Sequence, residues 1–330
     1  MATASGRKRV FSGIQPSGEL QLGNYLGAIK NWVEGQSENE NIFCIVDWHA
    51  ITVPQDPATL HRRNRELAKI YIAAGLDPSD TAIFIQSHVK EHAELAWLFN
   101  CITPMGWANR MTQFKEKTAD TKDRSSVGLL AYPMLMAADI LLYQTDGVPV
   151  GEDQRQHIEL TRDIAQTFNH HYGQVFKVPD AWIRKEGARI MSLQDPLKKM
   201  SKSDPAGCVF LLDPPEVISS KVKKAVTDSG RDVRFDEERP GLLNLLTIYQ
   251  LFSGRSRSEI EDHFAGQGYG ALKGQLAEMV VEDLRPLQQK FAELSKDEGY
   301  VEGILTASAD RIRPLAHATV AAASEAMGLG

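Results

Sequence analysis

The run R-V-F-S-G-I-Q-P-S-G-E-L-Q-L-G-N, residues 9–24, sets the architecture of this chain. Its first six residues are mostly apolar and include β-branched and aromatic side chains, which indicates a buried strand. Residues 23–33 follow with the apolar spacing of a helix. A glycine where a helix begins lets a ligand approach the backbone, and the first N–H groups and the helix dipole attract anions. The run therefore predicts a strand, an anion-binding turn and a helix, although an ordinary turn would use Gly and Pro equally well.

The same alternation continues along the first half of the chain. Apolar runs rich in β-branched and aromatic residues predict further strands at residues 42–46, 82–85 and 148–150. Helical spacing separates them at residues 57–74, 127–143 and 153–168. Strands that alternate with helices predict a parallel, doubly wound sheet of the Rossmann-like α/β class. Such a sheet holds a nucleotide where its first strand ends.

The second half of the chain has a different pattern. From about residue 214 the strand signals fade, and helical spacing dominates at residues 216–226, 241–252, 258–264, 270–294 and 300–327. We therefore expect a Rossmann-like domain over residues 1–195, a loop over residues 196–205 and a smaller α-helical domain over residues 206–330. The last helix of that domain has the length to pack back on the first domain.

Composition limits the possible classes of protein. The 330 residues suggest two domains at roughly 150 residues each, and 42% apolar with 24% charged residues excludes a disordered or fibrous chain. With 37 basic and 43 acidic residues the net charge is −6, so a nucleic acid must meet a local basic patch. Three separated cysteines predict neither disulfides nor a structural zinc site and favour a reducing cytoplasm. No segment suits export or membrane insertion.

Two polar, lysine-rich loops interrupt the pattern, at residues 115–126 and 195–205. In the second loop Lys198, Lys199 and Lys202 repel one another, which favours a mobile arm unless an anion gathers them. A solvated charge run would explain any three lysines. The literal string K-M-S-K-S at residues 199–203 is much more specific.

The strings Q-L-G-N at residues 21–24 and K-M-S-K-S together resemble the H-x-G-H and K-M-S-K-S signatures of class I aminoacyl-tRNA synthetases. Asn24 is usual in the tryptophan branch of that class, whereas Gln21 departs from the pattern. The resemblance to bacterial tryptophanyl-tRNA synthetases extends over nearly the whole chain. It includes G-I-Q-P-S-G (13–18), D-W-H-A-I-T (47–52), M-T-Q-F-K-E-K (111–117), M-A-A-D-I-L-L-Y (136–143) and V-P-V-G-E-D-Q (148–154). The tyrosine branch typically has G-S-D-Q where this chain has G-E-D-Q.

The resemblance implies a two-step reaction. L-tryptophan is activated by ATP to tryptophanyl-adenylate and pyrophosphate, and the tryptophanyl group then passes to the 3′-terminal adenosine of tRNA(Trp). The first domain would be catalytic and the helical domain would bind the anticodon. The resemblance also implies a cytoplasmic homodimer, with the apolar residues 95–111 as a candidate contact surface or a core helix. Mg²⁺ would bridge the phosphates, and no residue is expected to be a dedicated metal ligand.

The substrate carboxylate is itself the nucleophile, so the site must supply alignment and compensate the charge that builds on the phosphates. Lys199 and Lys202 are the candidates for holding the pyrophosphate as it leaves, with Lys117 reaching from the other loop. By resemblance, the residues expected at the nucleotide are Gln15, Ser17, Gly23, Asn24, Gly151, Asp153, Ile190, Lys199, Met200, Ser201 and Lys202.

The candidate amino-acid pocket depends on Asp139, a carboxylate within an apolar run that is costly to bury without a hydrogen-bond partner. At helical spacing Tyr132, Met136 and Asp139 share one face, which suits an indole because its only polar atom is the N–H donor. By resemblance, the residues around the substrate are Phe11, His49, Tyr132, Met136, Asp139, Val148, Val150 and Gln154. A partner within the core would also explain Asp139, core packing would also explain Met136, and His49 is equally well a structural histidine.

Other functions remain open from sequence alone. A related enzyme that activates tyrosine or another aromatic amino acid would share most of these motifs, and so would a non-catalytic regulator that binds adenylate or tRNA. Intact lysines in the second loop favour a catalyst over a binder. A dinucleotide oxidoreductase is disfavoured because no G-x-G-x-x-G follows the first strand. For tRNA, the candidate phosphate contacts are Lys221, Lys223, Lys224, Arg231 and Arg234, although a solvated helix face would look the same.

Overall fold

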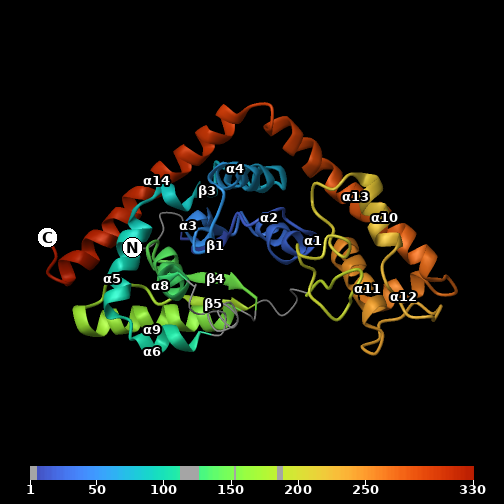
Figure 1. The fold of residues 1–330 in the computed structure, drawn as a ribbon, viewed down its shortest axis with the longest axis horizontal. Helices are drawn as coiled ribbons and strands as arrows, with labels where there is room; N and C mark the ends of the chain where they lie inside the picture. The colour runs from blue at the N-terminus through green and yellow to red at the C-terminus, as the bar shows by residue number, and fades with distance from the viewer. Residues whose placement is uncertain (1–5, 112–125, 152–153, 184–188) are drawn as a thin grey trace.

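The computed structural model describes residues 6–111, 126–151, 154–183 and 189–330. Its centre is one parallel sheet in the order β3-β2-β1-β4-β5, which is the arrangement of a doubly wound nucleotide-binding fold (Figure 1). The strands are β1 (Lys8–Ile14), β2 (Asn39–Ile45), β3 (Ala82–Ile85), β4 (Gly147–Val150) and β5 (Asp180–Ile183). The predicted α/β class is confirmed, and β5 is the one strand of this sheet that the sequence patterns missed.

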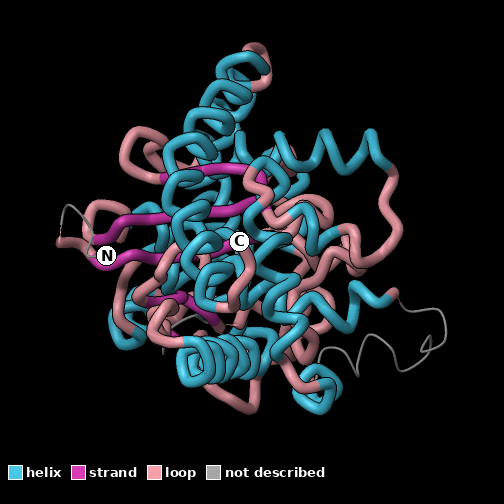
Figure 2. Tube along the Cα trace, turned by 90° about the vertical axis from the view of Figure 1, so that its left-hand side faces the viewer, coloured by secondary structure: helices cyan, strands magenta, loops and turns pink. Residues whose placement is uncertain are grey.

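Helices cover both faces of the sheet (Figure 2). Ile42 and Cys44 of β2 are buried against α5 (Glu91–Ile102), α8 (Val127–Leu141) and α9 (Arg155–Tyr172). Phe43 and Ile45, which point to the opposite face, are buried in the cluster that contains α4 (Pro57–Ala73). Because both faces are covered there, residues 42–45 of β2 are all apolar rather than alternating with polar ones.

The helix predicted directly after the first turn is present but is not uniform. It begins as α1 (Leu22–Asn24), widens to a π-helical turn η1 (Tyr25–Ile29) and ends as α2 (Lys30–Glu34). Turns of this wider kind occur often at functional sites. Three short helices follow strands or other helices in the same half, namely α3 (Asp47–Ala50), η2 (Gln86–His88) and α6 (Met105–Arg110).

The second half of the chain is helical, as predicted. Its elements are α10 (Pro215–Lys223), α11 (Pro240–Ser253), α12 (Arg257–His263), α13 (Tyr269–Leu294) and α14 (Glu298–Ala326). The two long helices α13 and α14 form an arch over the molecule, and α14 descends along β3, α4 and α5 (Figure 1). No helix in the described ranges combines the length and apolarity that crossing a membrane requires.

The helical half is joined to the first turn by main-chain pairing. The N–H of Leu22 donates to the carbonyl of Val209 at 2.9 Å, and the N–H of Leu211 donates to that of Leu20 at 3.0 Å. These apolar side chains belong to one buried cluster that runs from the sheet into α10, α11 and α13. The turn after β1 is therefore held from both halves of the chain.

Trp182 of β5 closes the edge of the sheet over Gly147 of β4. A Cβ atom on Gly147 would lie 2.1 Å from Cε2 and 2.4 Å from Nε1 of the indole, closer than real contacts allow. The position therefore excludes every side chain unless the ring moves.

We predict that Gly147→Ala lowers the free energy of unfolding by about 1–3 kcal/mol, because the new methyl group overlaps a rigid ring. Chemical denaturation measures the change. The control is Gly274→Ala in α13, where a Cβ meets nothing within 4 Å. That substitution should stabilise the helix by up to about 1 kcal/mol. Equal stability of Gly147→Ala and the parent chain would contradict the packing described for Trp182.

Candidate active site

A cavity of about 360 Å³ opens where β1 and β4 end, beside each other in the sheet. This is the point where the strand order reverses direction, and open parallel sheets bind ligands in the crevice outside such a point. The cavity is lined by the end of β1 and the turn after it, by the end of β4, and by side chains of α8, α3 and α2.

The structure brings the whole predicted amino-acid pocket together in this cavity. Its lining includes Phe11, His49, Tyr132, Met136, Asp139, Val148, Val150 and Gln154, all eight of the expected residues. From the expected nucleotide set, Gln15 and Gly151 also line it. Helix α8 places three of these side chains on one face because they are three and four residues apart, and the interior Pro133 does not interrupt that face.

Asp139 is the most buried charged group of the cavity, with 1% of its surface exposed. Its Oδ1 accepts from Nε2 of Gln86 at 2.6 Å and lies 2.7 Å from Nδ1 of His92. Its Oδ2 lies 2.8 Å from Nε2 of His49. Burial alone would raise the pKa of this carboxyl, but the His49 and His92 rings outweigh burial and hold the pKa below its ordinary value. Asp139 thus has hydrogen-bond partners in the core and also faces the cavity, so the structural and the ligand-binding interpretations both apply to it. The same is true of His49, which is bonded to Asp139 and lines the cavity.

Lys202 of the second loop reaches the turn after β1. Its Nζ donates to the carbonyl oxygens of Ser17 and Gly18, both at 3.3 Å. The loop is fixed beside this contact, because the N–H of Met200 donates to the carbonyl of Ile190 at 3.0 Å and the Met200 side chain is 2% exposed. The second signature string therefore contacts the turn that precedes the first string, 184 residues earlier in sequence.

The three lysines of this loop have different surroundings. Lys198 is paired with Asp195 at 2.8 Å, and Lys199 is exposed on a short bridge to Met191. Burial, followed by the nearby charge of Arg63, lowers the pKa of the Lys202 ammonium. A partly desolvated ammonium attracts an anion more strongly than one in water.

Gln21, the residue that departs from the signature, joins the two strings directly. Its side-chain oxygen accepts from the N–H of Gly23 at the start of α1, while its Nε2 donates to the carbonyl of Met200 at 3.3 Å. Its own N–H donates to Oδ1 of Asn24 at 3.2 Å. The side chain is 6% exposed. Gln21 therefore caps the helix and tethers the loop, and both ends of its amide group are used within the chain.

The remaining predicted residues divide into two groups. Ser17 is exposed in the turn before the first string, and Ser201 is exposed within the second, where its Oγ lies 2.9 Å from Ser203 Oγ. Lys117 and Asp153 lie outside the described residues. In the described part of the chain no three His, Cys, Asp or Glu side chains are grouped so that they could hold a metal ion.

The predicted basic patch is only partly available. Nζ of Lys221 is paired with Oδ2 of Asp213 at 2.7 Å and donates to the Cys208 carbonyl, so its charge is used within the fold. Arg234 forms an exposed pair with Asp232 at 3.0 Å. The exposed members are then Lys223, Lys224 and Arg231, together with Arg234.

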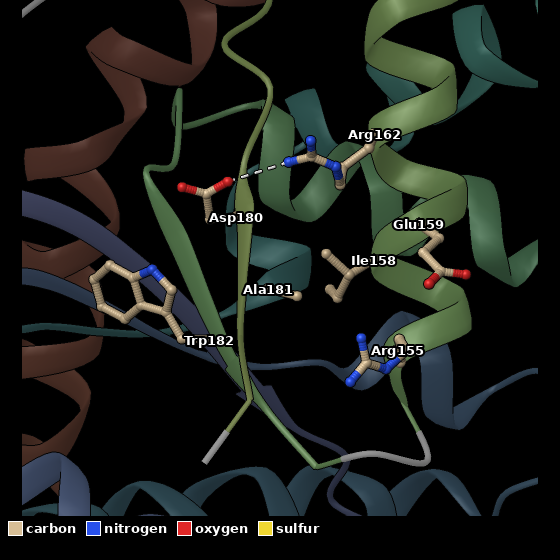
Figure 3. Close-up of a pocket in the computed structure, with 7 residues that line it drawn as sticks. All are labelled: Arg155, Ile158, Glu159, Arg162, Asp180, Ala181 and Trp182. Atoms are coloured by element: carbon tan, nitrogen blue, oxygen red, sulfur yellow. Dashed lines mark hydrogen bonds and ion pairs between the residues drawn. The ribbon is translucent and has the colours of Figure 1, made fainter. Parts of the chain in front are cut away.

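A second hollow lies between α9 and the edge strand β5, and Figure 3 shows its lining. From α9, Arg162 points toward Asp180 of β5 and Ile158 points toward Ala181. Arg162 is paired with Asp180 at 3.3 Å, so this charge is balanced at the edge of the sheet. None of the predicted site residues lines this hollow, and we do not place the site there.

Sequence patterns missed Gln86, His92 and Tyr143, which surround Asp139 from behind. Gln86 begins η2 directly after β3, His92 lies in α5, and Tyr143 follows the end of α8. A polar residue directly after the buried strand at residues 82–85 was the available signal for Gln86, because ligands and their supports gather where parallel strands end.

Several known proteins are similar to this chain. A family model described as tRNA synthetases class I (W and Y) matches residues 3–285. A tryptophan–tRNA ligase from Wolinella succinogenes is 54% identical over 325 residues, covering 98% of this chain and 99% of that protein. The solved tryptophanyl-tRNA synthetase of Mycoplasma pneumoniae is similar with a TM-score of 0.89, 37% identity and 98% coverage of each chain. That of Campylobacter jejuni, complexed with ADP and tryptophan, has a TM-score of 0.83 and 35% identity, covering 97% of this chain and 100% of that one.

We predict that Gln21→Glu loosens the second loop without removing the helix cap. The new carboxylate keeps an oxygen for the N–H of Gly23, but it places an acceptor against the carbonyl of Met200 where the amide donated. A neutral hydrogen bond is worth about 1 kcal/mol net, so trypsin should cleave after the lysines of residues 198–202 about fivefold faster or more.

The matched control is Gln194→Glu, whose amide also donates to a main-chain carbonyl at 3.3 Å, that of Lys224, but does not reach the first string. Its cleavage rate should stay within about twofold of the parent. The role assigned to Gln21 is wrong if Gln21→Glu is cleaved no faster than Gln194→Glu.

Proposed function

The chain belongs to the class I tRNA synthetases of the tryptophan and tyrosine family, and we infer that it activates L-tryptophan with ATP and transfers the tryptophanyl group to tRNA(Trp). The observation that carries the choice of amino acid is the cavity at the ends of β1 and β4. Its wall is largely apolar, and its buried carboxylate is an acceptor. An indole matches this wall because it is a large apolar ring with one N–H donor.

In the proposed first step a carboxylate oxygen of tryptophan forms a bond to the α-phosphorus of ATP. The bond from that phosphorus to the bridging oxygen breaks, and pyrophosphate leaves with the electron pair. Phe11, Val148 and Val150 wall the indole, while Tyr132 and Gln154 hold the α-ammonium. The side chains do not form a covalent intermediate, so their contribution is alignment and compensation of charge.

The nucleotide lies in the proposal along the turn after β1 and the start of α1, against Ser17, Gly23 and Asn24. Lys202 already contacts this turn, so its ammonium is placed to follow the charge that develops on the leaving pyrophosphate. Lys199 adds a second cation from the exposed side of the loop, and Lys117 a third. Mg²⁺ would be held by phosphate oxygens and water, which agrees with its preference for few protein ligands.

For the second step we assign the helical half, residues 206–330, to binding the tRNA anticodon, and residues 1–195 to catalysis. The exposed cations Lys223, Lys224 and Arg231 are the proposed phosphate contacts. On a chain with a net charge of −6, such contacts would make tRNA binding strongly dependent on salt.

The proposed assembly is a cytoplasmic homodimer. On α5 the side chains of Leu95 and Phe99 are buried in the core, but Trp97 is 68% exposed and Met105 on α6 is 65% exposed. Large apolar side chains that are exposed to solvent suit burial against a second copy of the chain. The three cysteines are free thiols, which fits a reducing compartment.

Amino-acid-dependent ATP–pyrophosphate exchange with all twenty amino acids, followed by charging of tRNA, tests the function. We expect that tryptophan is the one amino acid of the twenty that supports exchange at an appreciable rate. We also expect that the tryptophanyl group is transferred to tRNA(Trp). Exchange driven by tyrosine would support the related enzyme considered above. Binding of tRNA without exchange would support the non-catalytic regulator.

We predict that Lys202→Ala slows formation of tryptophanyl-adenylate by about a hundredfold, since a donor aimed at developing negative charge is worth about 3 kcal/mol. Single-turnover kinetics measures the rate, and the affinity for tryptophan should change by less than about threefold. Lys198→Ala removes a neighbouring cation that is exposed and paired with Asp195, and it should leave the rate within about threefold. A rate for Lys202→Ala close to that of the parent would refute the role of Lys202.

A further inference from the structure

A buried chain of polar side chains lies behind the tryptophan cavity and takes no part in the reaction described above. It runs from the Tyr143 hydroxyl to Nε2 of His92, at 2.8 Å, and from Nδ1 of His92 to Oδ1 of Asp139, at 2.7 Å. Tyr143 and His92 are both 0% exposed, and neither lines the cavity. Buried polar groups are costly unless they are fully hydrogen-bonded, so this arrangement constrains the groups that it joins.

The contact with Asp139 fixes the proton on Nδ1 of His92. An ionised carboxylate can only accept, so Nδ1 of His92 must carry a proton and donate it to Asp139. In the neutral ring Nε2 is then an acceptor, and the Tyr143 hydroxyl donates to it. The tautomer is assigned from this network of contacts. His92 therefore presents one N–H to Asp139 in a fixed direction.

The carboxylate of Asp139 has about four acceptor positions, two on each oxygen. The N–H groups of His92 and Gln86 occupy both positions on Oδ1. On Oδ2 the His49 ring nitrogen occupies one position, and one is left. Because Asp139 and His49 both line the cavity, the remaining acceptor position on Oδ2 is available to a ligand bound in the cavity.

We propose that His92, held in turn by Tyr143, is a positioning residue for the choice of amino acid, which rests on the proposed activation of tryptophan. It saturates Oδ1 and prevents the carboxylate from rotating, so that a single acceptor on Oδ2 is presented to a single ligand N–H. Without His92, a second lone pair becomes free and the carboxylate can turn, so the fixed match to an indole N–H is lost. Ring binding by the apolar wall does not depend on this contact.

The test compares tryptophan with 3-benzothienylalanine, in which sulfur replaces the ring N–H. The ratio of the two kcat/KM values in pyrophosphate exchange measures recognition of the N–H. His92→Ala should lower this ratio about tenfold or more, because a hydrogen bond to a charged group is lost. The change should lie in the KM for tryptophan, while the KM for ATP and for the analogue stays within about twofold.

Two amide variants form a matched pair. His92→Asn places an amide N–H near the position of Nδ1 and should restore most of the ratio. His92→Gln extends toward Tyr143, cannot donate to Asp139 from the same position and should behave as His92→Ala does. A purely structural role would lower the thermal stability of all variants without separating the Asn variant from the Gln variant.

If His92→Ala does not fold, Tyr143→Phe tests the same network. It removes the donor to Nε2 and should lower the ratio about threefold, whereas Tyr71→Phe, which removes another fully buried phenol, should leave the ratio unchanged. The proposal is overturned if the ratio of kcat/KM for tryptophan to that for 3-benzothienylalanine is unchanged in folded His92→Ala. It is also overturned if that ratio is unchanged in both Tyr143→Phe and His92→Gln. If the parent chain shows no tryptophan-dependent exchange, the proposed function fails, which is a separate result.

Discussion

A carboxylate that is kept ionised out of water is the constraint on which the site depends. Asp139 is 1% exposed, and an isolated charge in that position would take up a proton rather than remain ionised. Three N–H donors from three separate elements stabilise the charge, and they leave one acceptor facing an apolar cavity. Selectivity then follows from the same arrangement. A site that holds a desolvated acceptor strongly rejects a ligand that cannot donate to it.

The topology of the sheet explains why the proposed nucleotide and amino-acid sites lie beside this group. β1 and β4 are neighbours although they are more than 130 residues apart, and their ends form the floor of the cavity. The turn after β1 leads to the start of α1, and the second loop is folded onto this turn through Gln21 and Lys202. Cations and helix N–H groups are thus held beside the proposed nucleotide site, which would reduce the reorganisation that the reaction requires.

Local patterns in the sequence predicted much of this arrangement. Helical spacing within residues 127–143 placed Tyr132, Met136 and Asp139 on one face, and all three line the cavity. The strand β5 was missed because it is a four-residue edge strand whose first residue, Asp180, is exposed, so it lacks the apolar run of a central strand. The network behind Asp139 was missed for another reason. His92 and Gln86 lie 47 and 53 residues from Asp139 in sequence, and no local period relates positions so far apart. Tyr143 is close to Asp139 in sequence but joins the network through His92.

The most direct test of the account is a crystal structure of the chain with tryptophan and a non-hydrolysable ATP analogue. The account predicts the indole nitrogen about 2.7–3.2 Å from Oδ2 of Asp139, with His92 and Gln86 still on Oδ1. A tryptophan bound elsewhere, or with its indole nitrogen directed away from this carboxylate, would contradict it.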